Sequence, residues 1–125
     1  MKKVILSFIC LIGLSISASA QTQNELVGKW MLVKWTKNGR TQNIKEYFKT
    51  TSVLQVFQEN GDFESRIGSE STYSKWKLTK NDSELVIVDS MVSITSSIDY
   101  FDAKKRVITT PEMGTFEYKK IPDAE

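Results

Sequence analysis

The sequence contains no histidine, and its single cysteine, Cys10, lies in an apolar run near the N-terminus. Without histidine, the chain lacks the side chain that most often serves as a general base or metal ligand. Because no cysteine follows residue 10, thiol nucleophiles, thiolate metal sites and internal disulfides are excluded for the rest of the chain. The sequence also has no Gly-x-Ser-x-Gly motif and no glycine-rich phosphate loop. We therefore predict a protein that is not an enzyme and carries no cofactor or metal.

Acidic residues are the remaining candidates for catalysis, because glycosidases use a pair of carboxyl groups. Glu59, Asp62 and Glu64 lie close together, but they flank a turn and alternate outward, which is typical of a solvated surface. Asp89 and Asp99 lie among apolar residues, where strand ends and turns account for them. The carboxylates thus give no reason to expect catalysis.

The longest apolar run lies at the N-terminus. Lys2 and Lys3 precede the run over residues 4–14, and Ala18-Ser19-Ala20 forms a small-residue cleavage site. This is the pattern of a secretory signal peptide. A transmembrane helix needs roughly 20 apolar residues, and this run falls well short of that length.

The leader changes the interpretation of charge and location. A lipid anchor is disfavoured because Ile9 precedes Cys10, where a lipobox has a small residue. We predict cleavage after Ala20, which leaves one domain over 21–125 in the periplasm or outside the cell. Without the two leader lysines, 15 basic and 15 acidic residues remain. This balance favours no nucleic-acid partner, and no membrane span is expected after cleavage.

Glycine and proline are few, with six and two residues, and they mark turns between short alternating segments. Asn38-Gly39 and Asn60-Gly61 are typical of hairpin turns, because both residue types accept positive φ at low cost. Strands are predicted over about 25–35, 50–58, 62–67, 72–79, 84–88, 91–101, 106–110 and 115–121. About eight short strands without helical crossovers predict an all-β fold, a single antiparallel up-and-down barrel.

Strand alternation assigns side chains to faces. In the first strand it places Trp30, Leu32 and Lys34 on one face, and Met31, Val33 and Trp35 on the other. In the strand over 91–101 it places Val92, Ile94, Ile98 and Tyr100 together. The segment 43–49 fits an edge strand or a short helix capped by Asn43; we favour a short helix or lid.

Four blocks resemble lipocalin-like domains of secreted bacterial proteins. They are Leu26-x-Gly28-x-Trp30-x-Leu32, residues 57–63, Trp76-Lys77-Leu78 with Leu85-Val86-Ile87, and Phe116-Glu117-Tyr118-Lys119. The resemblance implies a calycin-type barrel whose closed end holds Gly28 and Trp30. It also implies a basic side chain of the last strand, Lys119 or Lys120, across the tryptophan ring. Lys119 is the residue assigned to this barrel base.

The aromatic residues lead to the functional hypothesis. An eight-stranded interior is either filled by side chains or holds one small ligand, and the sequence leaves both open. A pocket would open opposite Trp30, with segment 43–49 as its lid. Its predicted lining and lid are Tyr47, Phe48, Phe57, Phe63, Trp76, Tyr100, Phe116 and Tyr118.

Two functions follow from these residues. The first is non-enzymatic binding of a small hydrophobic or amphipathic molecule inside the barrel. The alternative is a protein-interaction or inhibitor module with a filled core. Asp89-Ser90-Met91 also resembles the acceptor sequence of some periplasmic O-glycosylation systems, and the sequence does not decide whether Ser90 is modified.

Overall fold

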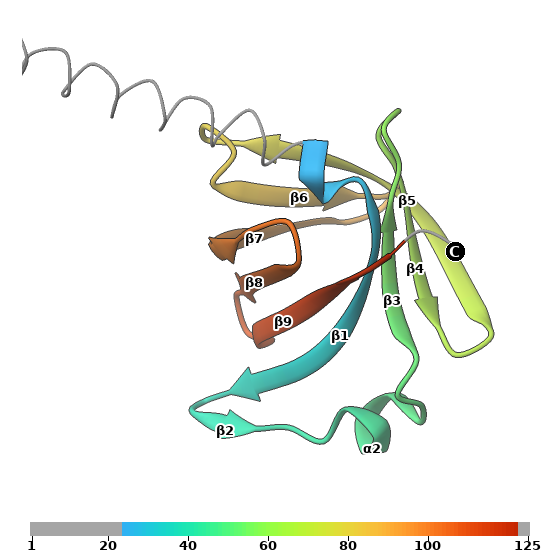
Figure 1. The fold of residues 1–125 in the computed structure, drawn as a ribbon, viewed down its shortest axis with the longest axis vertical. Coiled ribbons are helices and arrows are strands. Elements are labelled where there is room, and N and C mark those ends of the chain that lie inside the picture. The colour runs from blue at the N-terminus through green and yellow to red at the C-terminus, as the bar shows by residue number, and fades with distance from the viewer. Residues whose placement is uncertain (1–23, 123–125) are drawn as a thin grey trace, which may run out of the picture.

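The computed structural model describes residues 24–122, which form a closed antiparallel β-barrel (Figure 1). Its elements are β1 (Gly28–Lys37), β2 (Arg40–Thr41), α2 (Ile44–Phe48), β3 (Val53–Phe57), β4 (Asp62–Ile67), β5 (Glu70–Thr79), β6 (Glu84–Val88), β7 (Ser93–Phe101), β8 (Lys105–Thr110) and β9 (Gly114–Ile121). Eight strands, β1 and β3 to β9, pair in sequence order, and β9 pairs with β1 to close the sheet. The predicted up-and-down barrel is therefore confirmed, whereas the predicted signal peptide, 1–20, lies outside the described residues.

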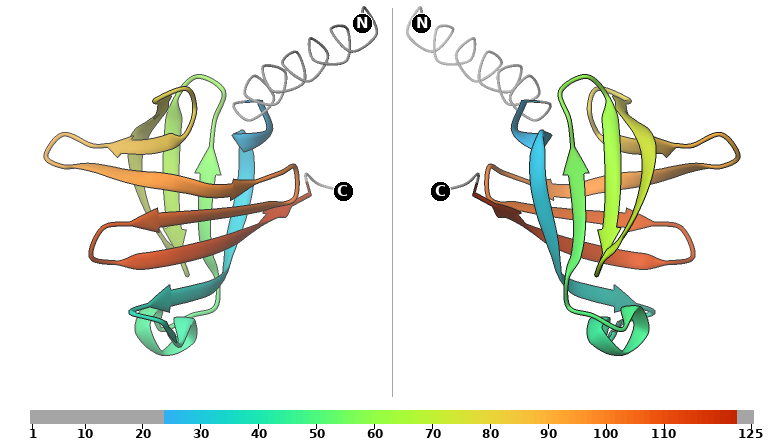
Figure 2. Two further views of the ribbon diagram at one scale, coloured as in Figure 1. Left: turned by 90° about the vertical axis from the view of Figure 1, so that its left-hand side faces the viewer. Right: turned by 90° about the vertical axis from the view of Figure 1, so that its right-hand side faces the viewer.

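The barrel is not evenly paired around its circumference. β1 pairs with β9 over residues 29–36 but with β3 only over residues 28–31, and its last two residues pair with the short strand β2. On the other side, β6 pairs with β5 only from Lys75 onward. Figure 2 shows the result, in which β1, β3, β4 and β5 run steeply across β6 to β9. The first half of β5 thus has no ladder with β6.

Two β-bulges change which side chains face inward. The ladder between β1 and β9 shifts register at Val33, so that Trp30, Leu32 and Trp35 are all buried. The ladder between β7 and β8 shifts at Asp99, which turns Tyr100 outward. A bulge adds one residue to one strand and therefore reverses the alternation beyond it. The face assignments that strict alternation gave to Trp35 and Tyr100 are wrong for this reason.

The segment after β2 is the predicted short helix, α2. The Asn43 side chain accepts a hydrogen bond from the Glu46 backbone N–H at 2.8 Å, as an N-cap should. Lys49 ends the helix in the left-handed conformation, with φ of 68°. Tyr47 and Phe48 pack against Trp35, with ring centroids 4.8 and 5.8 Å from its ring. Within residues 24–122, no helix is long and apolar enough to cross a membrane.

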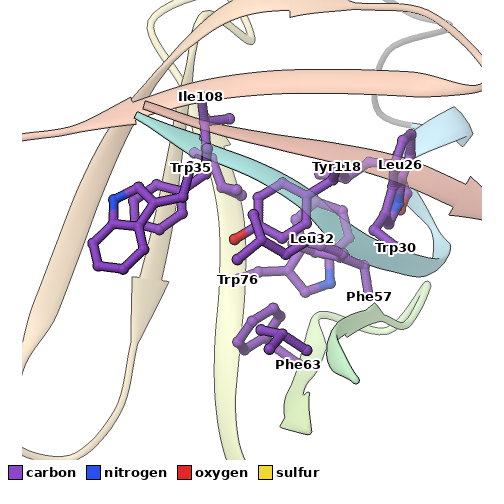
Figure 3. Packing of buried hydrophobic residues seen from close by; sticks show 12 residues of the cluster. Leu26, Trp30, Leu32, Trp35, Phe57, Phe63, Trp76, Ile108 and Tyr118 are labelled. Atoms are coloured by element: carbon purple, nitrogen blue, oxygen red, sulfur yellow. The ribbon is translucent and has the colours of Figure 1, made fainter. Parts of the chain in front are cut away.

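A hydrophobic cluster extends through the interior of the barrel (Figure 3). Leu26 and Trp30 lie together at one side of the cluster and Trp35 lies at the other. Phe57 and Trp76 meet edge to face at 5.5 Å, and the Trp76 indole donates to the Gln58 carbonyl at 2.8 Å. Because Gln58 follows β3 on the side of Trp30, these aromatics fill the same end, which we call the closed end.

Candidate functional site

The half of the barrel away from Trp30 contains a cavity of about 340 Å³. Its lining is drawn from the inner faces of β3 to β9 and from two turns: Gln55, Phe63, Ser65, Thr72, Ser74, Leu85, Ile87, Asp89, Val92, Ile94, Ser96, Ile108, Thr110, Met113, Phe116 and Tyr118. The lining turns are those that follow β6 and β8, at the end opposite Trp30. The cavity therefore opens away from the closed end.

The cavity exists because small side chains occupy inward positions there. Thr72 and Ser74 on β5 stand opposite Ser65 and Phe63 on β4, and Ser96 lies across the barrel on β7. Inward positions at the closed end instead hold tryptophan and phenylalanine. Interiors are normally packed almost without voids, so a run of serine and threonine facing inward leaves open space.

A surface hollow continues the cavity through the unpaired stretch of the wall. The cavity and this hollow share Phe63, Ser74 and Asp89, and the hollow extends outward past Tyr73 and Lys75. This is the stretch of β5 that has no ladder with β6. The shared lining indicates that the mouth of the cavity lies between β5 and the turn after β6.

The turn beside the mouth is held by one carboxylate. Asp89 accepts hydrogen bonds from the backbone N–H groups of Met91 and Val92, both at 2.8 Å, and these bonds lower the pKa of the Asp89 carboxyl. Met91 and Val92 are largely exposed, at 87% and 54%, and Ser90 is exposed as well. The rim of the mouth is thus apolar and fixed by an anionic turn.

At the closed end, Trp30 is fully buried, and its indole N–H donates to the Leu26 carbonyl at 2.8 Å. Lys120 places its ammonium 4.8 Å from the centroid of the Trp30 ring and donates to the Glu25 carbonyl at 2.6 Å. Gly28 has φ of 132°, and a Cβ there would lie 2.7 Å from Lys120 Cε. A side chain at position 28 would therefore be strained and would crowd this lysine.

The cation of β9 over Trp30 is thus Lys120 and not Lys119. Side chains alternate along β9, so Tyr118 and Lys120 face inward and Lys119 faces solvent. The assignment of Lys119 to the barrel base is corrected on this ground.

A second cation, Arg106 on β8, lies deeper in the closed end and is fully buried. Its guanidinium carbon lies 5.1, 4.9 and 4.2 Å from the ring centroids of Trp30, Phe57 and Tyr118. Arg106 Nη2 donates to Gln55 Oε1 at 2.6 Å. Burial lowers the pKa of Arg106 to about 10 and raises the pKa of Tyr118 to about 12. Arg106 therefore remains a cation at neutral pH.

Three of the aromatics predicted to form a pocket do line the cavity: Phe63, Phe116 and Tyr118. Phe57 and Trp76 lie instead in the closed end, where they fill space. The cavity-lining aromatics and the closed-end aromatics lie at different depths along the barrel axis. Strand alternation indicates which face a side chain occupies, but not its depth along the axis.

The other predicted pocket residues lie away from the cavity. Tyr47 and Phe48 do not line it; they cover Trp35, which stacks on the cavity-lining Phe116 at 5.6 Å. Tyr100 lies on the outer surface, where its hydroxyl donates to Asp102 at 2.6 Å. The bulge at Asp99 is the physical reason for this outward position.

Sequence reasoning missed Arg106 and Gln55, because charged and amide side chains are expected on the outer face of a strand. A signal was nevertheless present. Arg106 stands two residues before Ile108 and Gln55 two residues before Phe57, so alternation places both polar residues on apolar inner faces.

No protein-family model matches the chain, and no curated protein matches it in sequence. Among solved structures, the chain is similar to an uncharacterized protein from Bacteroides eggerthii, at 19% sequence identity and a TM-score of 0.59. The match covers 76% of this chain and 98% of that protein's chain. At this identity, the likeness shows only that the chain shares its barrel fold with a bacterial protein.

Proposed function

We propose that this protein is a non-enzymatic, lipocalin-like barrel that acts outside the cytoplasm and binds one small hydrophobic or amphipathic molecule inside the barrel. The observation that carries the proposal is the cavity of about 340 Å³ in the half of the barrel opposite Trp30. Ligand cavities typically measure roughly 300–1,000 Å³, so this one suits a small ligand. An apolar cavity of about 150 Å³ already binds benzene.

The lining supports a ligand that is mainly apolar. Leu85, Ile87, Ile94 and Ile108 contribute aliphatic surface from β6, β7 and β8, and Phe116 adds an aromatic ring. Pockets of this kind combine an apolar wall with a few polar groups that orient the ligand. The apolar rim at Met91 and Val92 gives such a molecule a favourable surface on its way in.

The rigid base supports the same function. The rings and cations of the closed end pack the strands together at that end. The barrel therefore does not need a bound ligand to keep its strands in place. Sites that are largely formed before binding lose less conformational entropy when the ligand arrives.

Titration with the neutral fluorescent dye N-phenylnaphthylamine tests the proposal. We expect a saturable rise in fluorescence, which Ser74→Phe should abolish because the phenyl ring would occupy the cavity that Ser74 lines. Tyr73→Ser is the matched control on the neighbouring residue. Tyr73 is 73% exposed, so dye that merely adheres to the surface should be lost with this variant, whereas dye inside the cavity should remain. A wild-type protein that gives no saturable signal contradicts the proposal.

The alternative function, a protein-interaction or inhibitor module, is favoured by one observation. Tyr73, Met91 and Val92 are exposed apolar side chains around the mouth. Under this alternative, Met91→Ser would weaken binding of a protein partner and leave dye binding intact. Under the proposed function, the same change would slow dye uptake.

A further inference from the structure

Within the described residues, 24–122, no carboxylate forms an ion pair with Arg106. Gln55 is its one hydrogen-bond partner there. Arg106 Nε and Nη1 are buried and have no hydrogen-bond partner in the described part of the chain. A buried cation flanked by aromatic rings gains cation–π energy, but it still favours an anion nearby.

Gln55 contacts Arg106 and also lines the cavity. Arginine can only donate hydrogen bonds, so Gln55 must turn its amide oxygen, Oε1, toward Arg106. The two N–H donors of Nε2 are then left for the cavity, which Gln55 lines. The floor of the cavity therefore presents donors, with a positive charge directly behind them.

The donors continue along the wall. Gln55, Ser65 and Thr72 stand opposite one another on β3, β4 and β5, and all three line the cavity. Opposite residues of neighbouring strands are about 5 Å apart, so the three form a continuous polar row. Across the barrel, the hydroxyls of Ser96 and Thr110 hydrogen-bond to each other at 2.7 Å, which uses one of their two O–H donors. The polar row faces the apolar side chains of Leu85, Ile87 and Ile108, which makes the cavity amphipathic. Asp89, the carboxylate among the lining residues, lies in the turn at the mouth.

We propose that the ligand is a small amphipathic carboxylate, with its carboxylate on the amide of Gln55 and the hydroxyl of Ser65 and its hydrocarbon part against the apolar wall. Arg106 acts as a positioning residue, because it fixes the Gln55 amide and supplies the positive field without touching the ligand. This inference rests on the proposed function, whose ligand class it specifies. The cavity has more than twice the volume of one that holds benzene, so a ligand with at least about a dozen non-hydrogen atoms fits.

Calorimetric titration of the exported, purified protein with decanoate, decanol and decylammonium tests the proposal. The three probes share one alkyl chain and differ in head group. Hydrogen bonds to charged groups exceed neutral ones by about 1 kcal/mol, so we expect decanoate to bind about fivefold more tightly than decanol. Decylammonium should bind most weakly. Equal affinities for decanoate and decanol overturn the inference and leave the proposed function standing, whereas a protein that binds none of the probes overturns both.

Two variants of Gln55 locate the preference. Gln55→Leu removes the amide donors, and Gln55→Glu gives Arg106 a carboxylate partner within the protein, so both should bring the ratio of decanoate to decanol affinity close to one. Decanol affinity reports in each variant whether the cavity is intact. A variant that binds decanol and keeps the fivefold preference for decanoate overturns the inference.

A measurement on the wild-type protein does not depend on the folding of any variant. The side-chain NH₂ resonances of Gln55 should shift strongly in ¹⁵N-resolved NMR spectra with decanoate and only weakly with decanol. Resonances that respond equally to both probes place the head group elsewhere and overturn the inference.

Discussion

The closed end and the cavity half of the barrel are built from the same strands, yet the first is packed with side chains and the second contains open space. The closed end stacks aromatic rings around two cations, Arg106 and Lys120, and reaches full burial. In the cavity half, the same inward positions carry serine, threonine and glutamine, and space remains. The comparison teaches that the depth of a residue along a strand, as well as the face it occupies, decides whether it stabilises the fold or shapes a site.

The difference also separates stability from binding. Trp30 joins Leu26, Phe101 and both cations at one point, so its contacts bind the N-terminal segment to β7, β8 and β9. Among the described residues, no buried aromatic makes a comparable set of contacts at the mouth, where the first half of β5 has no ladder with β6. We therefore expect substitutions at the closed end to change unfolding free energy, and substitutions in the cavity to change ligand binding.

The largest effect is expected for Trp30→Ala. The side chain is fully buried, so its removal leaves a cavity, takes the ring from beneath Lys120 and removes one of the three rings around Arg106. Truncation of a buried large aromatic costs about 3–5 kcal/mol, which is a large share of the stability of a small domain. Urea unfolding followed by circular dichroism measures the change. A loss below about 1 kcal/mol would mean that the closed end is not the stabilising half.

A matched pair of aliphatic truncations sharpens the comparison. Leu26 is fully buried at the closed end, and Ile94 at the cavity mouth is 48% exposed. Leu26→Ala should cost about 2–5 kcal/mol, and Ile94→Ala less than about 1 kcal/mol, because little burial is lost. The same urea experiment ranks the two variants. Equal losses would show that the two halves contribute alike.

A smaller effect is expected for Asn43→Ala, which removes the cap of α2. Loss of an N-cap costs about 1 kcal/mol of helix stability. Because Tyr47 and Phe48 do not line the cavity, dye affinity should change less than about twofold while hydrogen exchange at Glu46 becomes faster. Asn43→Asp, which preserves a capping oxygen, is the control. A clear loss of dye affinity in Asn43→Ala alone would make α2 a lid, as the sequence predicted.

The elements and the closed end could be read from the sequence largely because their signals are local. Asn-Gly turns, strand alternation and the Asn43 cap each depend on neighbouring residues, and the strands were placed within a few residues of their observed bounds. The bulges at Val33 and Asp99 depend on the register with a partner strand, so the positions of Trp35 and Tyr100 could not be read in the same way. The cavity depends on depth across seven strands, and only the inward serines hinted at it.

The smallest effect concerns the turn at the mouth. Hydrogen bonds from the N–H groups of Met91 and then Val92 hold the pKa of Asp89 below its ordinary value of 3.8. A carboxyl group with a lowered pKa in the folded state stabilises the turn above the unfolded value, and this contribution disappears as pH falls through the lower, folded value. Acidification should therefore shift the amide resonances of both donors with a midpoint below 3.8, while the closed end stays unchanged. Asp89→Asn keeps an accepting oxygen but cannot titrate, so its resonances should not move. A wild-type midpoint at or above 3.8 would mean that the turn does not depend on the ionised carboxylate.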